Sequence, residues 1–345
     1  MHEGASCKSK GVFRGIMTRL DELVAQITQK HVYIQTHNFP DPDAIASAFG
    51  MQELLKTRGI ASTICYRGRV DRYSTEKMCQ YLGIAMMNIE DIADKLSDSD
   101  EVILVDAQKG NANIIDIAGE EIICIDHHPT FEEQTYRFTD IRPEVGACSS
   151  MIAQYFFENE VPVDDRVATA LTFGIRMDTK SLIRGASKLD MEMMYRLFEQ
   201  CNQSVINSLE NSSLYFDDLL AYSKAIYSIK VYDNISFADT GRNCPEGLIA
   251  SVSDFMLALV EVNFSIVYSR KEEGIKLSVR SELPELDAGK IARDALSGIG
   301  NGGGHAEMAG GFVPFKGNDE QADMLVKEIQ ERFYNCIARR AVYVK

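Results

Sequence analysis

The chain has 345 residues, of which 45% are hydrophobic and 25% charged, a composition typical of a water-soluble globular protein with room for two cores. No stretch is apolar enough to cross a bilayer, and the N-terminal residues lack the apolar centre of a secretory signal, so no membrane partner is expected. The net charge of −15 disfavours long duplex nucleic acid, whose binding needs a basic face, and leaves short substrates open.

Strand-like and helix-like segments alternate through the first half of the chain. The expected strands are residues 31–36, 62–66, 101–106 and 121–126. The expected helices are residues 44–59, 74–83, 149–160 and 165–178. This alternation predicts an α/β domain with a parallel sheet and helices on both faces, in which ligands bind at the carboxyl ends of the strands.

The second half is expected to contain a polar helical segment followed by a smaller α/β unit. Strands are expected within residues 225–239, 264–281 and 310–315, with a hairpin turn at 271–274, and helices at 245–261 and 287–296. The resulting division is a first domain over residues 1–190, a helical connector over 191–224 and a second domain over 225–345.

The chain has few histidines, and most of them lie in short segments rich in aspartate or glycine. The six histidines are His2, His31, His37, His127, His128 and His305. His31 begins an apolar strand and is expected to be structural, and His2 lies near the terminus. The other four lie in segments that suggest chemistry.

Three of these segments follow predicted strands. The first, His37-Asn38-Phe39-Pro40-Asp41-Pro42-Asp43, lies between a strand and a helix, the second is Asp106, and the third is Asp126-His127-His128. A fourth acidic residue, Asp178, ends a predicted helix. Taken singly, Asp43 is also compatible with a helix cap, and Asp178 on its own favours a capping or surface aspartate.

Together these residues predict a metal site at one rim of the sheet. Imidazole and carboxylate ligands without thiolate suit manganese and similar divalent ions, and the eight cysteines form no CxxC pair that would indicate a zinc ribbon or a disulfide framework. Reduced cysteines fit a cytoplasmic protein. Two ions at such a rim would clamp the attacking and leaving oxygens of a phosphoryl transfer and activate a bridging water.

The order and spacing of the four segments resemble motifs I to IV of the DHH phosphoesterase superfamily over roughly residues 15–190. The resemblance implies two divalent ions, manganese first, with magnesium or cobalt as alternatives. It implies that His37 and Asp41 hold one ion, that Asp43, His127 and Asp178 hold the other, and that Asp106 bridges them. Asp126 would support the ligands, and His128 would face the substrate phosphate as donor or general acid.

A glycine-rich segment, Asn301 to Gly311, resembles the GGGHxxAAG signature of the DHHA1 domain, with Met308 where that family has alanine. The resemblance implies that the segment and Arg280 bind the substrate phosphate, through Asn301, Gly303, Gly304, His305 and the guanidinium. A glycine loop without a ligand is the alternative for the run taken alone.

The resemblance implies a manganese-dependent phosphoesterase that acts on short RNA oligonucleotides or small nucleotides such as pApA and pAp. A soluble cyclic-dinucleotide phosphodiesterase is the main alternative, and a catalytically decayed nucleotide-binding regulator, or an RNA-binding accessory module, is less favoured because every expected ligand is present. An inorganic pyrophosphatase and a RecJ-like exonuclease are disfavoured by the second domain and by the chain length. The sequence leaves open the exact substrate and whether the protein forms a homodimer.

Overall fold

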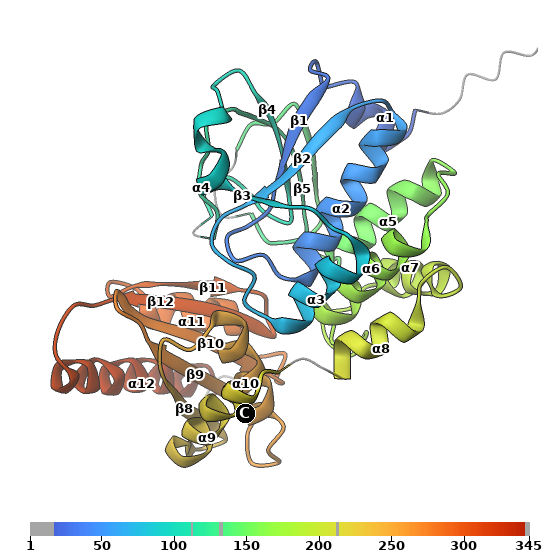
Figure 1. The fold of residues 1–345 in the computed structure, drawn as a ribbon. Helices are drawn as coiled ribbons and strands as arrows, with labels where there is room; N and C mark the ends of the chain where they lie inside the picture. The colour runs from blue at the N-terminus through green and yellow to red at the C-terminus, as the bar shows by residue number, and fades with distance from the viewer. Residues whose placement is uncertain (1–16, 112, 131–133, 212–213, 342–345) are drawn as a thin grey trace, which may run out of the picture.

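The computed structural model describes residues 17–111, 113–130, 134–211 and 214–341. Within these ranges the chain forms two α/β domains, each built on a six-stranded sheet (Figure 1). The expected fold class is therefore confirmed. No helix in the described part of the chain is long and apolar enough to span a membrane.

The first sheet is entirely parallel and has the strand order β3-β2-β1-β4-β5-β6. Its strands are β1 (His31–Gln35), β2 (Ala61–Tyr66), β3 (Met87–Asn88), β4 (Glu101–Val105), β5 (Glu120–Asp126) and β6 (Phe138–Ile141). From β1 the chain proceeds outward to β2 and β3 and then returns to β4 on the other side. The carboxyl ends of β1 and β4 thus meet at the switch point where ligands bind in open α/β sheets.

Helices cover both faces of this sheet, but unequally. The main core lies on the face covered by α1 (Arg19–Val24), α2 (Pro42–Thr57), α3 (Tyr73–Leu82), α5 (Cys148–Glu158), α6 (Asp165–Asp178), α7 (Lys188–Phe198) and α8 (Gln203–Asn211). On the opposite face the short helix α4 (Ile89–Ile92), which is followed by η1 (Ala93–Lys95), buries Ile89 and Ile92 against Cys65 of β2. This thinner layer leaves α2, α5 and α6 to set the position of the strand-end loops.

The expected connector is helical, but its helices pack on different domains. Met193 and Leu197 of α7 are buried in the core of the first domain. Helix α9 (Leu219–Ser228), which follows η2 (Phe216–Asp218), instead packs in the second domain through Ala221 and Ala225. Because α9 continues to Ser228, the expectation of strand structure over residues 225–228 is wrong: the buried alanines pack as one face of a helix.

The second sheet is mixed, with the order β11-β12-β10-β9-β8-β7 and one parallel pair, β8 with β9. Its strands are β7 (Lys230–Tyr232), β8 (Ile235–Arg242), β9 (Phe264–Arg270), β10 (Gly274–Ser281), β11 (Asn301–Gly304) and β12 (Met308–Pro314). The predicted hairpin joins β9 and β10, where the Lys271 amide donates to the Gly274 carbonyl at 2.7 Å.

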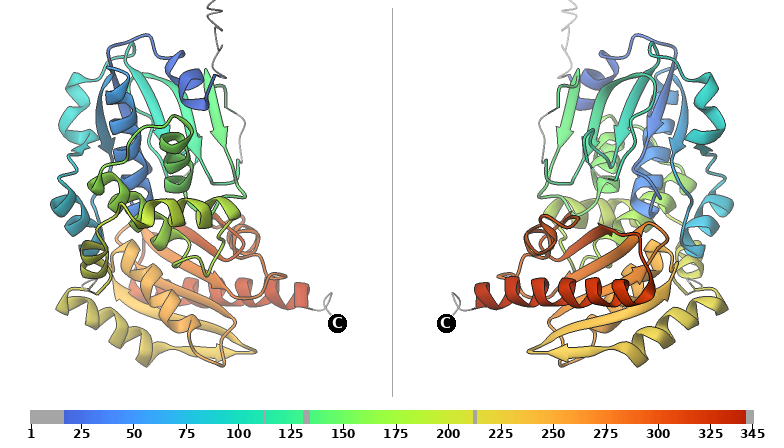
Figure 2. Two further views of the ribbon diagram at one scale, coloured as in Figure 1. Left: turned by 90° about the vertical axis from the view of Figure 1, so that its right-hand side faces the viewer. Right: turned by 90° about the vertical axis from the view of Figure 1, so that its left-hand side faces the viewer.

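Helices cover both faces of the second sheet as well (Figure 2). Helices α11 (Ala288–Leu296) and α12 (Asp319–Ala341) pack on one face, and α9 and α10 (Glu246–Leu257) pack on the other. Helix α12 was not predicted, although its buried residues recur with helical spacing at Val326, Ile329, Phe333 and Ile337.

Candidate metal centre

The ends of β1, β4 and β5 bring a histidine, an aspartate and a second histidine to one rim of the first sheet. His37 lies just beyond β1, Asp106 directly follows β4, and His127 directly follows β5. Asp106 and His127 are 2% and 1% exposed. Asp106 also has a φ of 58°, a left-handed conformation that non-glycine residues rarely adopt. Burial and backbone strain both mark this rim as a specialised position.

The carboxylate of Asp106 faces two histidines, one with each oxygen. Its Oδ2 lies 3.6 Å from Nε2 of His37, and its Oδ1 lies 3.2 Å from Nε2 of His127. Asp106 Oδ1 and His127 Nε2 are both buried and have no hydrogen-bond partner among the described residues. Buried polar atoms without partners are costly in a folded protein, so this pair is arranged for something other than protein hydrogen bonds.

Asp41 completes a first group around His37. The Nε2 of His37 lies 3.9 Å from Asp41 Oδ1, and its Nδ1 lies 2.9 Å from the Asn38 carbonyl, which fixes the ring. Asp41 Oδ1 also accepts from the amides of Asp43 and Ala44, so Asp41 rather than Asp43 caps α2. Burial alone would lower the pKa of His37, but the hydrogen bond and charge of Asp41 outweigh it and raise that pKa to about 10.

Asp43 and Asp178 form a second group around His127. The Nε2 of His127 lies 3.8 Å from Asp43 Oδ2 and 3.3 Å from Asp178 Oδ2. Its Nδ1 lies 3.1 Å from the Val145 carbonyl and donates to it in the tautomer that leaves Nε2 free. Helix α5 holds Asp43 in turn, because the amides of Cys148 and Ser149 donate to its two oxygens at 2.7 and 2.9 Å.

The donor set fits divalent metal ions. His37, Asp41 and Asp106 form one group whose donor atoms lie within 4.8 Å of one another, and Asp43, His127 and Asp178 form another. Burial, followed by neighbouring carboxylates, raises the pKa of Asp43, and burial raises that of Asp178 to about 6. Carboxylates crowded in this way are stabilised by cations, and oxygen with imidazole suits manganese, magnesium or cobalt.

Asp126 and His128 form a pair beside these groups. The buried Asp126 accepts hydrogen bonds from the His127 amide and from Nδ1 of His128, both at 2.8 Å. The other ring nitrogen of His128, Nε2, is therefore not bound to Asp126. Gln108, which the sequence analysis did not single out, donates to Asp126 Oδ2 at 2.7 Å and to the His128 carbonyl at 2.9 Å. Burial opposes a charge on His128, but the Asp126 carboxylate raises its pKa above the ordinary value.

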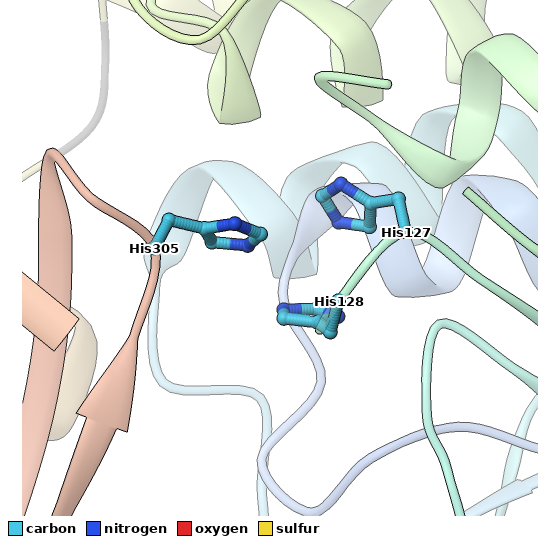
Figure 3. A group of neighbouring side chains, drawn as sticks. All are labelled: His127, His128 and His305. Atoms are coloured by element: carbon cyan, nitrogen blue, oxygen red, sulfur yellow. The ribbon is translucent and has the colours of Figure 1, made fainter. Parts of the chain in front are cut away.

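The second domain reaches this site through His305. Its ring centroid lies 5.3 Å from that of His127 and 4.9 Å from that of His128, and the side chain points from the segment after β11 toward both rings (Figure 3). Burial and the nearby charges of His128 and His127 lower the pKa of His305 to about 3. A neutral imidazole from one domain thus lies beside the candidate metal ligand His127 and beside His128 of the other domain.

The glycine run forms the edge strand β11 rather than an irregular loop. A Cβ at Gly302 would lie 2.6 Å from the Ala292 carbonyl oxygen, and one at Gly304, where φ is 144°, would lie 2.5 Å from the Met308 carbonyl oxygen. These two glycines permit close backbone packing against α11 and β12. Gly303 has nothing within 4 Å of its missing Cβ, and Asn301 is exposed, so these two face open space.

Arg280 is buried and already has partners. Its Nε donates to Asp254 Oδ1 at 3.0 Å, and its Nη1 donates to Ser278 Oγ at 3.1 Å. A cavity between the domains is lined on one side by His127, Asp178 and Arg184 and on the other by a stretch from His305 to Met308, and Arg280 is not among its lining residues. Arg184 and Asp254 carry no recognisable sequence signal, because their positions depend on how the two domains meet.

His31, the other histidine in the described part of the chain, is not part of the site. His31 pairs through Nε2 with Thr63 Oγ1 at 2.9 Å on the first sheet, in agreement with a structural role. His2 lies outside the described residues.

Comparison with known proteins identifies the two halves of the chain. The DHH family, N-terminal domain, matches residues 31–175, and the DHHA1 domain matches residues 231–335. The chain therefore carries a DHH-family N-terminal domain joined to a DHHA1 domain.

Three relatives are similar to this chain at moderate identity. An uncharacterized protein of Methanocaldococcus jannaschii is 32% identical over 81% of this chain and 57% of its own length, and the cyclic-di-AMP phosphodiesterase GdpP of Bacillus subtilis is 25% identical over 94% and 51%. A probable bifunctional oligoribonuclease and PAP phosphatase, NrnA, of Streptococcus mutans is 27% identical over 47% of this chain and 48% of its own. The chain thus spans about half the length of these relatives.

The fold also has a counterpart among solved structures. An exopolyphosphatase-related protein from Bacteroides fragilis superposes with a TM-score of 0.72 at 18% identity, covering 94% of this chain and 97% of that one. At this identity the similarity supports the two-domain fold alone.

Proposed function

We propose that the chain is a metal-dependent phosphodiesterase that hydrolyses short nucleotide substrates of the linear dinucleotide class, with manganese as the preferred ion. The observation that carries the proposal is the Asp106 carboxylate, whose two oxygens face two different histidines while Asp106 Oδ1 and His127 Nε2 lack hydrogen-bond partners. A bridging ligand between two ions needs such a placement.

In this proposal His37 and Asp41 hold one ion, Asp43, His127 and Asp178 hold the other, and Asp106 is shared. When bound, the two ions would polarise the phosphate oxygens and make a water molecule more acidic. The Val145 carbonyl keeps His127 Nε2 free to bind, and the α5 amides hold Asp43 in place. Such supporting contacts orient the ligands before any substrate arrives.

His128 is the proposed proton donor to the leaving oxygen. Asp126 binds its Nδ1 at 2.8 Å and raises the pKa of the ring, which favours the charged form, and Gln108 fixes Asp126 in turn. The partly exposed ring can therefore present Nε2–H to a phosphate oxygen and then take up a new proton from solvent.

The second domain supports the choice of a short substrate. His305 lies against His127 and His128, so both domains bound the space around the candidate metal groups. A dinucleotide bound at these groups would lie between the two domains, whereas a longer strand would need an opening in the contact between them. The relatives that act on cyclic-di-AMP and on oligoribonucleotides lend support to the same substrate class.

The proposal is tested by offering purified protein pApA, pAp, cyclic di-AMP, a 20-nucleotide RNA and pyrophosphate side by side, with manganese, magnesium or cobalt and with EDTA. We expect fastest turnover of pApA with manganese and none in EDTA. Turnover that survives EDTA, or a clear preference for the long RNA or pyrophosphate, contradicts the proposal.

Cyclic di-AMP is the second candidate, because 94% of this chain is similar to GdpP. Faster turnover of cyclic di-AMP than of pApA in the same assay would select it.

A further inference from the structure

The carboxylate of Asp190 is completely buried in the first domain. It belongs to the first turn of α7 and is 0% exposed. Its Oδ2 accepts from the amide and the hydroxyl of Ser187, both at 2.6 Å, and from the Gly146 amide at 2.8 Å. Its Oδ1 accepts from the Ser150 hydroxyl at 2.5 Å. Two amides and two hydroxyls hold this carboxylate, and no cation is among these partners.

A helix cap accounts for only part of this arrangement. Ser187 and Asp190 form a capping box at the start of α7, which satisfies amides of that helix. The bonds from Gly146 and Ser150 reach beyond α7, to the loop between β6 and α5 and to α5 itself. Burying a carboxylate costs free energy even when its oxygens have partners, so the cap alone does not explain a position without solvent.

Gly146 brings the buried carboxylate to a peptide beside the metal centre. A Cβ at this glycine would lie 2.9 Å from Asp190 Oδ2 and 2.8 Å from the Gly185 carbonyl oxygen, so a side chain would push the amide away from its acceptor. Val145 and Gly146 both line the cavity that His127 also lines. The close approach therefore depends on glycine at this position.

One peptide group connects Asp190 to His127. The carbonyl of Val145 and the N–H of Gly146 belong to the same planar amide. The N–H donates to Asp190, and the carbonyl accepts from Nδ1 of His127 at 3.1 Å in the tautomer that leaves Nε2 free. Hydrogen bonds in such a chain polarise one another, because a carboxylate at the N–H increases the negative charge on the carbonyl oxygen. The imidazole at the end of the chain is thereby oriented and made a stronger electron donor.

We infer that Asp190 is a positioning residue for the metal centre: through the Val145–Gly146 peptide, its buried charge orients the ring of His127 and strengthens Nε2 as a metal ligand. The inference rests on the proposed function, because it takes His127 as a ligand of a divalent ion. It extends the site into α7, a helix that contributes no candidate metal ligand of its own.

The test separates the charge of Asp190 from its hydrogen bonds. In Asp190→Asn the amide oxygen can replace Oδ2 while the NH2 group donates to Ser150 Oγ, so the four bonds remain and only the charge is lost. Asp190→Ala removes both. Ser187→Ala is the matched control, since it weakens the start of α7 but keeps the charge and the bond to Gly146.

Manganese binding to the full chain is measured without substrate, by EPR of the free ion, and turnover of pApA is measured at limiting and at saturating manganese. We expect Asp190→Asn to weaken one of the two manganese sites about tenfold and Asp190→Ala to weaken it about a hundredfold. Saturating manganese should restore most of the turnover of Asp190→Asn. Ser187→Ala should bind both ions as the wild type does, although it should unfold at a lower urea concentration.

A second readout needs no metal. In the ion-free protein the Nδ1 proton of His127 is observed by NMR after labelling with 15N-histidine. The charge of Asp190 strengthens the hydrogen bond from this proton to the Val145 carbonyl. The proton should therefore resonate further downfield in the wild type and in Ser187→Ala than in Asp190→Asn.

A purely structural role of Asp190 predicts a different pattern. Unchanged manganese affinity in Asp190→Asn overturns the inference, and so does an unchanged proton shift, which would exclude the path through the peptide. An equal loss of manganese affinity in Ser187→Ala overturns it as well. Should the wild type bind manganese but cleave no nucleotide, the proposed function fails and the affinities still decide the role of Asp190. Should it bind no manganese, the metal assignment fails, and with it the inference.

Discussion

At the scale of single residues, Asp106 shows how one side chain can meet several demands at once. It ends a buried strand, it adopts a left-handed backbone conformation, and it turns its two oxygens toward different histidines. Aspartate and asparagine tolerate this conformation better than other residues with side chains, since their short polar groups bond locally. The strain and the unpartnered oxygen are both explained if metal binding offsets their cost.

Asp106→Asn should lower kcat about a thousandfold or more. The amide keeps the left-handed backbone and the shape of the side chain but removes the charge shared between the two groups, which is worth several kcal/mol in metal-assisted phosphoryl transfer. Turnover of the preferred nucleotide and manganese content after dialysis are measured together. Full turnover with full metal content in this variant would reject the role assigned to Asp106.

The sequence indicated the acidic and histidine residues of the site because strand-terminal position and residue type are visible in one dimension. Gln108 was not found, since a glutamine two residues beyond a strand has no distinctive pattern, and its role comes from bonds to Asp126 and to the His128 carbonyl. Arg184 and Asp254 were missed for a similar reason: their meeting depends on the placement of two separately folded units.

At the scale of elements, the junction of α2, α5 and α6 fixes the geometry of the site. Gly174 lies in α6 where the three helices converge, and a Cβ there would lie 2.3 Å from Ser149 Oγ and 3.1 Å from Asp43 Oδ1. The absence of a side chain at Gly174 lets the first turn of α5 donate its amides to Asp43. Helix packing and ligand placement are therefore coupled at this position.

Gly174→Ala should destabilise the protein, although alanine ordinarily favours a helix over glycine by about 1 kcal/mol. Overpacking at the junction should outweigh this helix preference and lower the free energy of unfolding by about 1–3 kcal/mol, as measured by urea denaturation. Gly303→Ala is the comparison for stability, because nothing lies within 4 Å of its added Cβ. Equal stability of the Gly174 variant and the wild type would show that the helices shift freely.

Strand β6 is attached to α5 by a buried carboxylate whose contribution depends on pH. Asp140 accepts from the Tyr155 hydroxyl at 2.6 Å and from Arg142 Nε at 2.7 Å. Burial opposes its charge, but the hydrogen bonds of Arg142 and Tyr155 outweigh burial and lower the pKa of Asp140. A carboxyl with a lowered folded pKa stabilises the protein above its unfolded pKa, which is about 3.9, and loses that stabilisation as the pH falls.

Asp140→Asn should therefore lower the free energy of unfolding by about 1–3 kcal/mol between pH 5 and pH 8. The difference from the wild type should shrink as the pH falls below about 4, through the lowered pKa of the folded protein. Denaturation curves of both proteins across this range provide the measurement. A difference that stays constant down to acid pH would mean that the charge of Asp140 does not stabilise the fold.

The elements that could be predicted were those with a clear hydrophobic pattern or a clear polar residue at their end. The four central strands of the first sheet are rich in apolar and β-branched residues, whereas β3 has two residues and β6 has four, too few to show a pattern. Strand β11 consists of an asparagine and three glycines, a composition that gives no strand signal, and its conformation depends on pairing with β12.

At the scale of the whole molecule, the candidate site lies where the two domains meet. The first domain supplies the candidate metal ligands, and the second supplies His305, whose ring lies against His127 and His128. Other contacts hold the domains together nearby, since the Glu246 amide donates to Asp71 at 3.1 Å. The family resemblance predicted both domains, but the sequence alone could not reveal that His305 faces the histidine pair rather than solvent.

His305→Ala is the variant that tests this arrangement, because it removes the only described histidine of the second domain and leaves the ligands of the first intact. The pKa of His305 is lowered to about 3, so the ring is neutral near pH 7 and can donate one hydrogen bond without adding charge beside the candidate metal ligands. Loss of a preorganised donor of this kind should reduce kcat for pApA about a hundredfold while manganese content stays unchanged. His31→Ala serves as the matched histidine control, since His31 bonds to Thr63 away from the site. Equal turnover by the two variants would mean that the second domain encloses the substrate without contacting the reacting phosphate.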